Sequence, residues 1–184
     1  GLTVAGSGGS GIAGSGTINV VVQTDETRAS IGALEALGSG DPAFAVTSVT
    51  TGKGNVTLEA DSDAIIVPLS GAIAGGSGPA FGATIVTLSR IAETTALIGG
   101  GAMIAAGVTN ATVITDSGAS RTIRGIDLVA TSSPVLVATG IAGAVGGGGA
   151  AAGVIAVVTS DEDVTAMVRG AALNTDGNVT LFAD

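Results

Sequence analysis

Apolar and polar residues alternate in short runs of Val, Ile and Thr along most of this chain. Alternation with a period of two residues predicts β-strands, because successive side chains of a strand point to opposite faces. Gly, Asn, Asp and Ser flank the runs and supply the turns. The predicted strands are TINVVVQT, NVTLEA, TIVTLS, NATVIT, IDLVAT, PVLVAT, VIAVVT and NVTLFA. The pattern predicts an all-β protein with little or no helix, and only residues 27–38, where Leu34 and Leu37 have helical spacing, admit a helix.

The chain also repeats itself. Residues 14–33, 81–100 and 152–171 share a glycine-rich run, a β-branched strand, a short acidic turn, a second strand and a glycine, with Ala29, Ala96 and Ala166 at offsets of 67 and 70 residues. A second element, GNVTLEAD at 54–61, returns as GNVTLFAD at 177–184 and in weaker form as RGIDLVAT at 124–131. We therefore expect one domain made of about two and a half repeats. Its expected repeat boundaries are 1–67, 68–134 and 135–184.

Many short strands at a fixed period, bounded by small residues, favour a parallel β-helix, or β-solenoid. Aromatic residues make up only 2% of the chain, so large rings cannot build its core. Stacked coils suit small residues because equivalent side chains lie above one another. Coils of about 20 residues would give roughly nine coils in this length. An antiparallel sandwich or barrel is the alternative, although it usually has larger core residues and more two-residue hairpins.

One stretch resembles a known family. GAIAGGSGPAFGATIVTLSRIAETTALIGGGAMI, together with the GNVTLEAD type of strand, is similar to repeats of the large bacterial hemagglutinin-like and leukotoxin-like surface adhesins. The resemblance implies a right-handed parallel β-helix with a structural, adhesive role and no catalysis. The middle element RGIDLVAT departs from the family pattern, and the chain is far shorter than those proteins.

Charge and composition exclude several classes of function. The net charge is −9, with only six Lys and Arg residues, so the chain lacks the cationic surface that nucleic acids require. It contains no His and no Cys, which rules out disulfides, thiol nucleophiles and Ser-His-Asp triads within the chain and makes a zinc site untenable. We expect no enzyme and no cofactor.

The glycine runs invite three interpretations. Residues 146–149 lack the Lys and Ser/Thr that follow the last glycine of a phosphate-binding loop. The uncharged run 132–160 is long enough for a membrane span, but its glycines weaken a helix, and no Trp/Tyr belt or basic flank accompanies it. We expect instead that close approach of backbones explains these runs. The residues predicted to serve packing or assembly are Gly75, Gly76, Gly146 and Gly147.

Two acidic clusters and three sequons complete the candidate sites. Carboxylates can bind calcium, although solvated turn residues are the simpler interpretation of DSD and DED. The candidate calcium ligands are Asp61, Asp63, Asp161 and Asp163. The candidate glycosylation sites, each followed by Thr two residues later, are Asn55, Asn110 and Asn178.

The terminal sequence NVTLFAD predicts a strand without a cap, and an uncapped solenoid end exposes unpaired backbone groups. We therefore expect an extracellular or cell-surface structural protein that stacks end to end on itself, or a segment of a longer fibre or adhesin shaft. A calcium- or carbohydrate-binding adhesion module is the alternative, and a glycine-rich membrane protein or an ice-binding surface are more remote ones.

Overall fold

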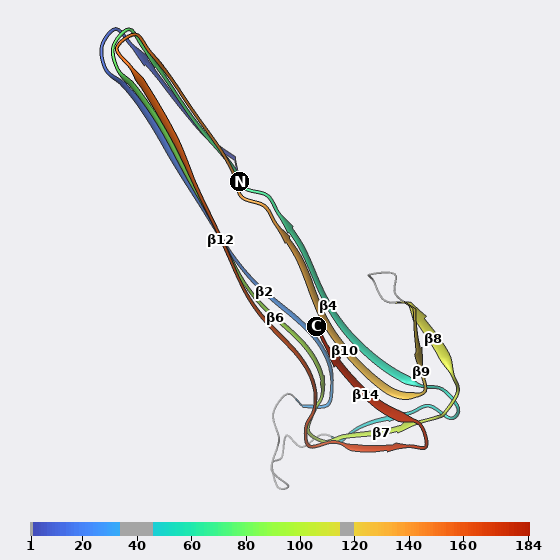
Figure 1. Cartoon of the computed structure of the whole chain (residues 1–184). Coiled ribbons are helices and arrows are strands. Elements are labelled where there is room, and N and C mark those ends of the chain that lie inside the picture. The colour runs from blue at the N-terminus through green and yellow to red at the C-terminus, as the bar shows by residue number, and fades with distance from the viewer. Residues whose placement is uncertain (1, 34–45, 115–119) are drawn as a thin grey trace. The chain divides into compact units, whose positions relative to one another are not determined.

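The computed structural model describes residues 2–33, 46–114 and 120–184, and every regular element in these ranges is a β-strand (Figure 1). The strands of the first repeat are β1 (Leu2–Gly9), β2 (Ala13–Ile31), β3 (Thr47–Thr50) and β4 (Val56–Ile66). Those of the second are β5 (Leu69–Gly76), β6 (Ala80–Ile98), β7 (Ala102–Ala106), β8 (Ala111–Ile114), β9 (Ser120–Ile123) and β10 (Gly125–Leu136). Those of the third are β11 (Thr139–Gly146), β12 (Ala150–Val168), β13 (Ala172–Thr175) and β14 (Asn178–Ala183).

The prediction of an all-β protein is therefore confirmed. The helix considered for residues 27–38 does not begin there, since β2 continues to Ile31 and its β-branched residues suit a strand. Leu34 and Leu37, on which the helical spacing depended, lie outside the described residues.

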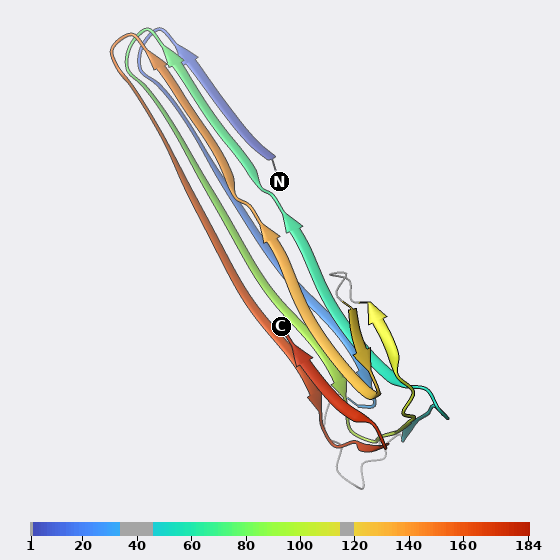
Figure 2. The ribbon, with the colours of Figure 1, turned by 45° about the vertical axis from the view of Figure 1, so that its right-hand side comes forward.

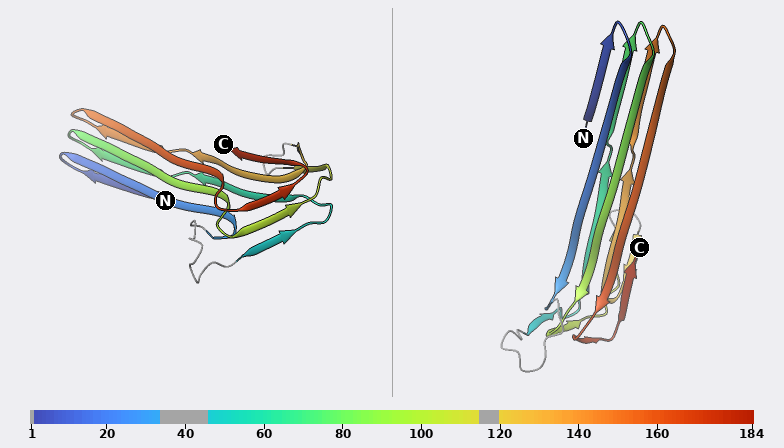
Figure 3. Two further views of the ribbon diagram at one scale, coloured as in Figure 1. Left: turned by 90° about the horizontal axis from the view of Figure 1, so that it is seen from below. Right: turned by 90° about the vertical axis from the view of Figure 1, so that its left-hand side faces the viewer.

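Equivalent strands of the three repeats pair with one another. Four three-stranded sheets have the orders β1-β5-β11, β2-β6-β12, β3-β7-β13 and β4-β10-β14, so the second repeat is central in each (Figure 2). The strands β2, β6 and β12 run in the same direction (Figure 3). In the described part of the chain, the antiparallel pair β8–β9 within the second repeat and the isolated antiparallel bridge between Ala33 and Gly100 lie outside this scheme. The first and third repeats therefore supply the edge strands of all four sheets.

The pairing follows the sequence repeat in register. Leu69 lies opposite Leu2 on one side and Thr139 on the other, in parallel sheets. Hydrogen bonds at the beginning of the long strands, from Ala13 N to Pro79 O and from Ala80 N to Gly149 O, keep the same offsets. The expected coil of about 20 residues, and with it the count of about nine coils, is wrong. Paired strands are one whole repeat apart, because β2, β6 and β12 are each 19 residues long and the chain runs from Leu2 to Leu69, and from Leu69 to Thr139, before it returns to a paired position.

The described chain forms two compact units, and each takes segments from all three repeats. The first unit comprises Gly1–Asp25, Asp63–Ile91 and Pro134–Asp161, and the second comprises Glu26–Ser62, Ala92–Ser133 and Glu162–Asp184. A unit is therefore built across the repeats rather than from one of them.

The first unit buries small and hydroxylated side chains together with Val86, Leu88 and Arg90. Ala13, Ala74 and Ala80 form its buried apolar cluster. Beside them the Thr17 hydroxyl lies 2.9 Å from the Ser70 hydroxyl and 3.3 Å from that of Thr84. These hydroxyls satisfy one another, so the polar groups are buried without the cost of an unpaired donor.

Two glycines allow the opposing sheets of the first unit to approach closely. A Cβ atom on Gly140 would lie 2.5 Å from Cγ1 of Val154, and one on Gly82 would collide with the backbone oxygen of Gly143. No real Cβ is accommodated at such distances, so the spacing of the sheets depends on glycine at these positions.

Larger aliphatic side chains fill the second unit. Its buried cluster draws on strands of three sheets: Ala96 and Ile98 from β6, Ala102 and Ile104 from β7, and several residues of β4 and β10. The members from β4 and β10 are Val56, Ala60, Ile126, Leu128 and Ala130. Burial of these groups on three sides gives this unit an ordinary hydrophobic core without aromatic rings.

An ion pair links the first two repeats inside the first unit. The side chain of Arg90 is fully buried, and its Nε donates to Oδ2 of Asp25 at 3.1 Å. Asp25 also accepts two hydrogen bonds of 2.9 Å from the side-chain amide of Gln23. The pair places opposite charges on adjacent strands, where they offset the cost of burying the guanidinium.

We expect Asp25→Ala to lower the free energy of unfolding by about 3 kcal/mol, because it deprives a buried cation of a partner. The double variant Asp25→Ala/Arg90→Met should recover most of this loss, since the buried charge is then gone. Chemical denaturation measures both, and Asp63→Ala, which removes an exposed carboxylate, is the control. Equal losses in the single and double variants would show that the ion pair contributes nothing specific.

Candidate functional site

The glycine runs singled out in the sequence form the strands β5 and β11 and the stacked turns that follow them. The turns join β1 to β2, β5 to β6 and β11 to β12. Ser77 N donates to Gly9 O at 3.4 Å, Gly78 N to Gly11 O at 3.2 Å, and Gly147 N to Gly76 O at 3.3 Å. The three turns are therefore hydrogen-bonded to one another, as the strands are.

Two of the four predicted packing glycines have no room for a side chain, and a third, Gly76, has little. A Cβ on Gly76 would lie 3.0 Å from Gly11 O, one on Gly147 would lie 2.5 Å from Ser77 O, and one on Gly146 would lie 2.6 Å from Gly78 O. Gly75 differs, because nothing lies within 4 Å of its Cβ position and Val145 occupies the equivalent place in β11. The close approach of the turns thus involves Gly76, Gly146 and Gly147, whereas Gly75 faces open space.

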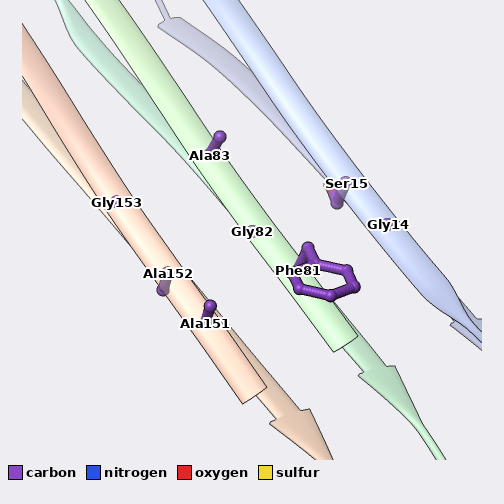
Figure 4. Close-up of a pocket in the computed structure, with 8 residues that line it drawn as sticks. All are labelled: Gly14, Ser15, Phe81, Gly82, Ala83, Ala151, Ala152 and Gly153. Carbon is purple, nitrogen blue, oxygen red and sulfur yellow. The ribbon is translucent and has the colours of Figure 1, made fainter. Parts of the chain in front are cut away.

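A shallow hollow lies on the outer surface of the β2-β6-β12 sheet in the first unit. Figure 4 shows the ring of Phe81 standing on β6 between the small residues of β2 and β12. The hollow is lined by Gly14, Ser15, Phe81, Gly82, Ala83, Ala151, Ala152 and Gly153, and none of these eight carries a titratable side chain. Such a lining can contact an apolar group but offers nothing for acid–base chemistry.

The β8–β9 hairpin contributes an ion pair that sequence reasoning missed. Arg121 on β9 donates to Oδ2 of Asp127 on β10, and Asp127 is only 2% exposed. Burial raises the pKa of Asp127 above its usual 3.8, while the charge of Arg121 and its hydrogen bond oppose this rise. The scarcity of basic residues was the available signal, since the whole chain contains only six.

The side chain of Asn55 forms hydrogen bonds to two backbone groups in the same region of the second unit. Its side-chain nitrogen donates to Thr109 O at 2.7 Å, and its side-chain oxygen accepts from Gly125 N at 2.8 Å. A glycan on this nitrogen would break the first bond, so the structure gives Asn55 a packing role. The other two sequon residues, Asn110 and Asn178, are exposed.

The four acidic residues considered as calcium ligands do not gather. Asp61 accepts a hydrogen bond of 2.9 Å from the Thr131 hydroxyl, and Asp163 accepts one of 3.2 Å from the Thr165 hydroxyl. In residues 2–33, 46–114 and 120–184, no three acidic side chains come together in a way that could hold a metal ion. Within the same ranges there is also no helix long and apolar enough to span a membrane.

Among the described residues, the four large sheets end in strands that have a neighbour on one side only. β12 and β14 each have a partner on one side only, and so do β2 and β4 at the opposite end of the strand order. Leu128 on β10 is fully buried, whereas Leu181, its in-register partner on β14, is 46% exposed. Apolar side chains and unpaired backbone groups are thus left uncovered together at the third repeat.

Gly146→Ala should lower the free energy of unfolding by about 2–4 kcal/mol, because the new methyl group would meet Gly149 O of its own turn and Gly78 O of the neighbouring turn. Gly75→Val should be tolerated, since valine already stands at the equivalent position 145. Thermal and chemical denaturation of the two variants give the comparison. Similar stability of both would contradict the proposed tight stacking of the turns.

Because the pKa of Asp127 is raised, its contribution to the free energy of unfolding changes with pH in a defined direction. The folded state holds the proton more tightly than the unfolded state, so this residue's contribution to stability falls as pH rises from 3.8 through its folded-state pKa. The variant Asp127→Asn should therefore gain stability relative to the wild type across that interval. Arg121→Gln should raise the pKa of Asp127 further, which an NMR titration of the Asp127 carboxyl carbon measures. A lower pKa in Arg121→Gln would contradict the proposed role of the guanidinium.

Comparisons of the chain with protein-family models, with curated proteins and with solved structures found no match.

Proposed function

We propose that this chain is a non-enzymatic, extracellular structural protein, a β-solenoid that forms a subunit or segment of a surface fibre or adhesin shaft. Its partner is a further copy of itself, added end to end. The resemblance of its repeats to those of hemagglutinin-like and leukotoxin-like adhesins motivates the extracellular location and the adhesive setting.

The observation that carries this proposal is the order of strands in the four large sheets. In each sheet the second repeat is central, the first repeat lies at one edge and the third at the other. The two edges are not alike, so contact between the third repeat of one copy and the first repeat of the next is a heterologous contact. A contact of this kind that does not close into a ring generates a filament.

The exposure of apolar residues supports the same conclusion. Inside the chain, Ile126 on β10 is 1% exposed, while its partner Val179 on the edge strand β14 is 44% exposed. A further strand paired with β14 would cover Val179, as β14 covers Ile126. Covering such side chains supplies the hydrophobic part of the association energy.

A proline on the free edge of β12 tests the proposal. Because Gly149 O accepts from Ala80 N, odd-numbered residues at the beginning of β12 face β6 and even-numbered residues face the free side. Ala152→Pro should therefore abolish filaments in negative-stain images while leaving the thermal stability of the monomer nearly unchanged. Ala151→Pro is the matched control, because it removes a hydrogen bond to β6 and should destabilise the fold itself.

Two results would contradict the proposal. The first is a wild-type protein that stays monomeric by sedimentation at every concentration and at both neutral and acid pH. The second is an Ala152→Pro variant that forms filaments as readily as the wild type, which would place the contact elsewhere than on this edge.

A further inference from the structure

We propose that acidity controls this end-to-end association, because stacking brings carboxylates of two copies into register as like-charged pairs. The inference rests on the proposed function and adds its regulation. The partner is a second copy of this chain. Protons shared between carboxylates of the two copies regulate the association.

The existing register predicts which residues would meet. Hydrogen bonds from Gly99 N to Ile31 O and from Arg169 N to Ile98 O fix the register at the end of the long strands. Counting back along the strands, Glu26, Glu93 and Asp163 form one line across β2, β6 and β12. A second copy added to β12 in the same register would place its Glu26 beside Asp163.

A second like-charged pair arises on the sheet of β4, β10 and β14. Val137 N donates to Ile66 O, and Asp184 N donates to Ala130 O. These bonds align Asp61, Thr131 and Asp184, so a second copy would place its Asp61 beside Asp184. Both pairs lie within the second compact unit of their chains.

The charged groups around the first pair do not neutralise it. Inside one chain Nη2 of Arg28 lies 2.7 Å from Oε1 of Glu26 and 3.3 Å from Oε1 of Glu93, so the guanidinium already forms an ion pair with both. Asp163 accepts a hydrogen bond from the uncharged Thr165 hydroxyl, which stands on β12 where Arg28 stands on β2. Its neighbours on β12, Asp161 and Glu162, are acidic as well. A stacked contact would therefore gather Asp163, Glu26 and Glu93 around a single guanidinium.

The surroundings of the second pair are acidic too. Asp61 accepts a hydrogen bond from the Thr131 hydroxyl, which carries no charge. The other ionisable residues of β4 on the same face are Glu59 and Asp63. A proton shared between Asp61 and Asp184 would remove the repulsion and add a hydrogen bond, as in other close pairs of carboxyl groups.

The second copy is favoured as the occupant because both free edges have filled equivalents inside the chain. The strand β10 already pairs in parallel with GNVTLFAD of β14 on one side and with the β4 strand of GNVTLEAD on the other. The free side of β14 corresponds to the side of β10 that holds β14, and the free side of β4 corresponds to the side of β10 that holds β4. The contact between copies would thus repeat a contact that the chain already makes twice.

The experiment measures the critical concentration for assembly by sedimentation and negative-stain imaging at pH 7 and pH 4, in buffer with a chelator and constant salt. Each proton taken up at the contact makes association about tenfold stronger for each pH unit over which it is taken up. We expect the wild type to assemble at pH 4 at a concentration at least about tenfold lower than at pH 7. Circular dichroism at both pH values checks that the fold persists.

Variants separate these two pairs from the general effect of negative charge. Asp163→Asn/Asp184→Asn should lower the critical concentration at pH 7 about fivefold or more and weaken its dependence on pH. Asp161→Asn is the matched control, because it removes a similar charge from the same face of β12 but stands opposite Thr24 in the stacked register. Asp163→Lys, which places a cation beside Glu26, should assemble at pH 7 and lose this ability in high salt.

The outcomes distinguish the two proposals. Equal assembly of the wild type at pH 7 and pH 4, or equal effects of Asp161→Asn and Asp163→Asn/Asp184→Asn, would overturn the control by acidity and leave end-to-end association standing. Failure of the wild type and of every variant to assemble at either pH would overturn both. Assembly at pH 4 that persists in Ala152→Pro would show acid aggregation unrelated to this edge, and would overturn the inference.

Discussion

Parallel hydrogen bonding between equivalent residues of successive repeats is the constraint on which this fold depends. The offsets of 67 and 70 residues between Leu2, Leu69 and Thr139 place each side chain beside its counterpart one repeat away. A residue is therefore suitable only if it tolerates a similar neighbour on the adjacent strand. Alanine, threonine and glycine meet this condition easily, which accounts for a core with almost no aromatic rings.

The same constraint makes charged residues a special problem. Where like charges align, as with Glu26 and Glu93, a basic residue must lie diagonally between the strands, and Arg28 does so. Where a charge enters the interior, a partner on the adjacent strand accompanies it, as Asp25 does for Arg90. The chain has only six basic residues for these tasks, so several carboxylates depend on hydroxyl groups or solvent instead.

The sequence alone was sufficient for the strand content, because alternation in segments such as TINVVVQT is a local property. The repeat offsets also turned out to be the offsets of pairing, since Ala13, Ala80 and Ala150 align as the repeat predicts. The length of one level was not predictable in the same way. Nothing in the alternation of β2 shows that it continues for 19 residues before the chain turns.

The contacts of single side chains could not be predicted from the sequence either. Asp127 and Arg121 are six positions apart, and only the return of the β8–β9 hairpin onto β10 brings them together. Gly75 and Gly76 look alike in the sequence, yet only Gly76 approaches the backbone of a neighbouring turn. Distinctions of this kind depend on which face of a strand meets which turn, and the residue type does not encode that information.

The long separation between paired residues has a consequence for how the protein folds. Leu2 must find Leu69 and Leu69 must find Thr139, so each of these contacts closes a loop of nearly a whole repeat. The chain loses conformational entropy when each loop closes, before the contact stabilises the fold. Chains with a high contact order therefore fold slowly. A chain of this design would pass much of its folding time with unpaired strands, which favours folding in sequence order, one repeat at a time, as each new repeat finds a finished edge as its template.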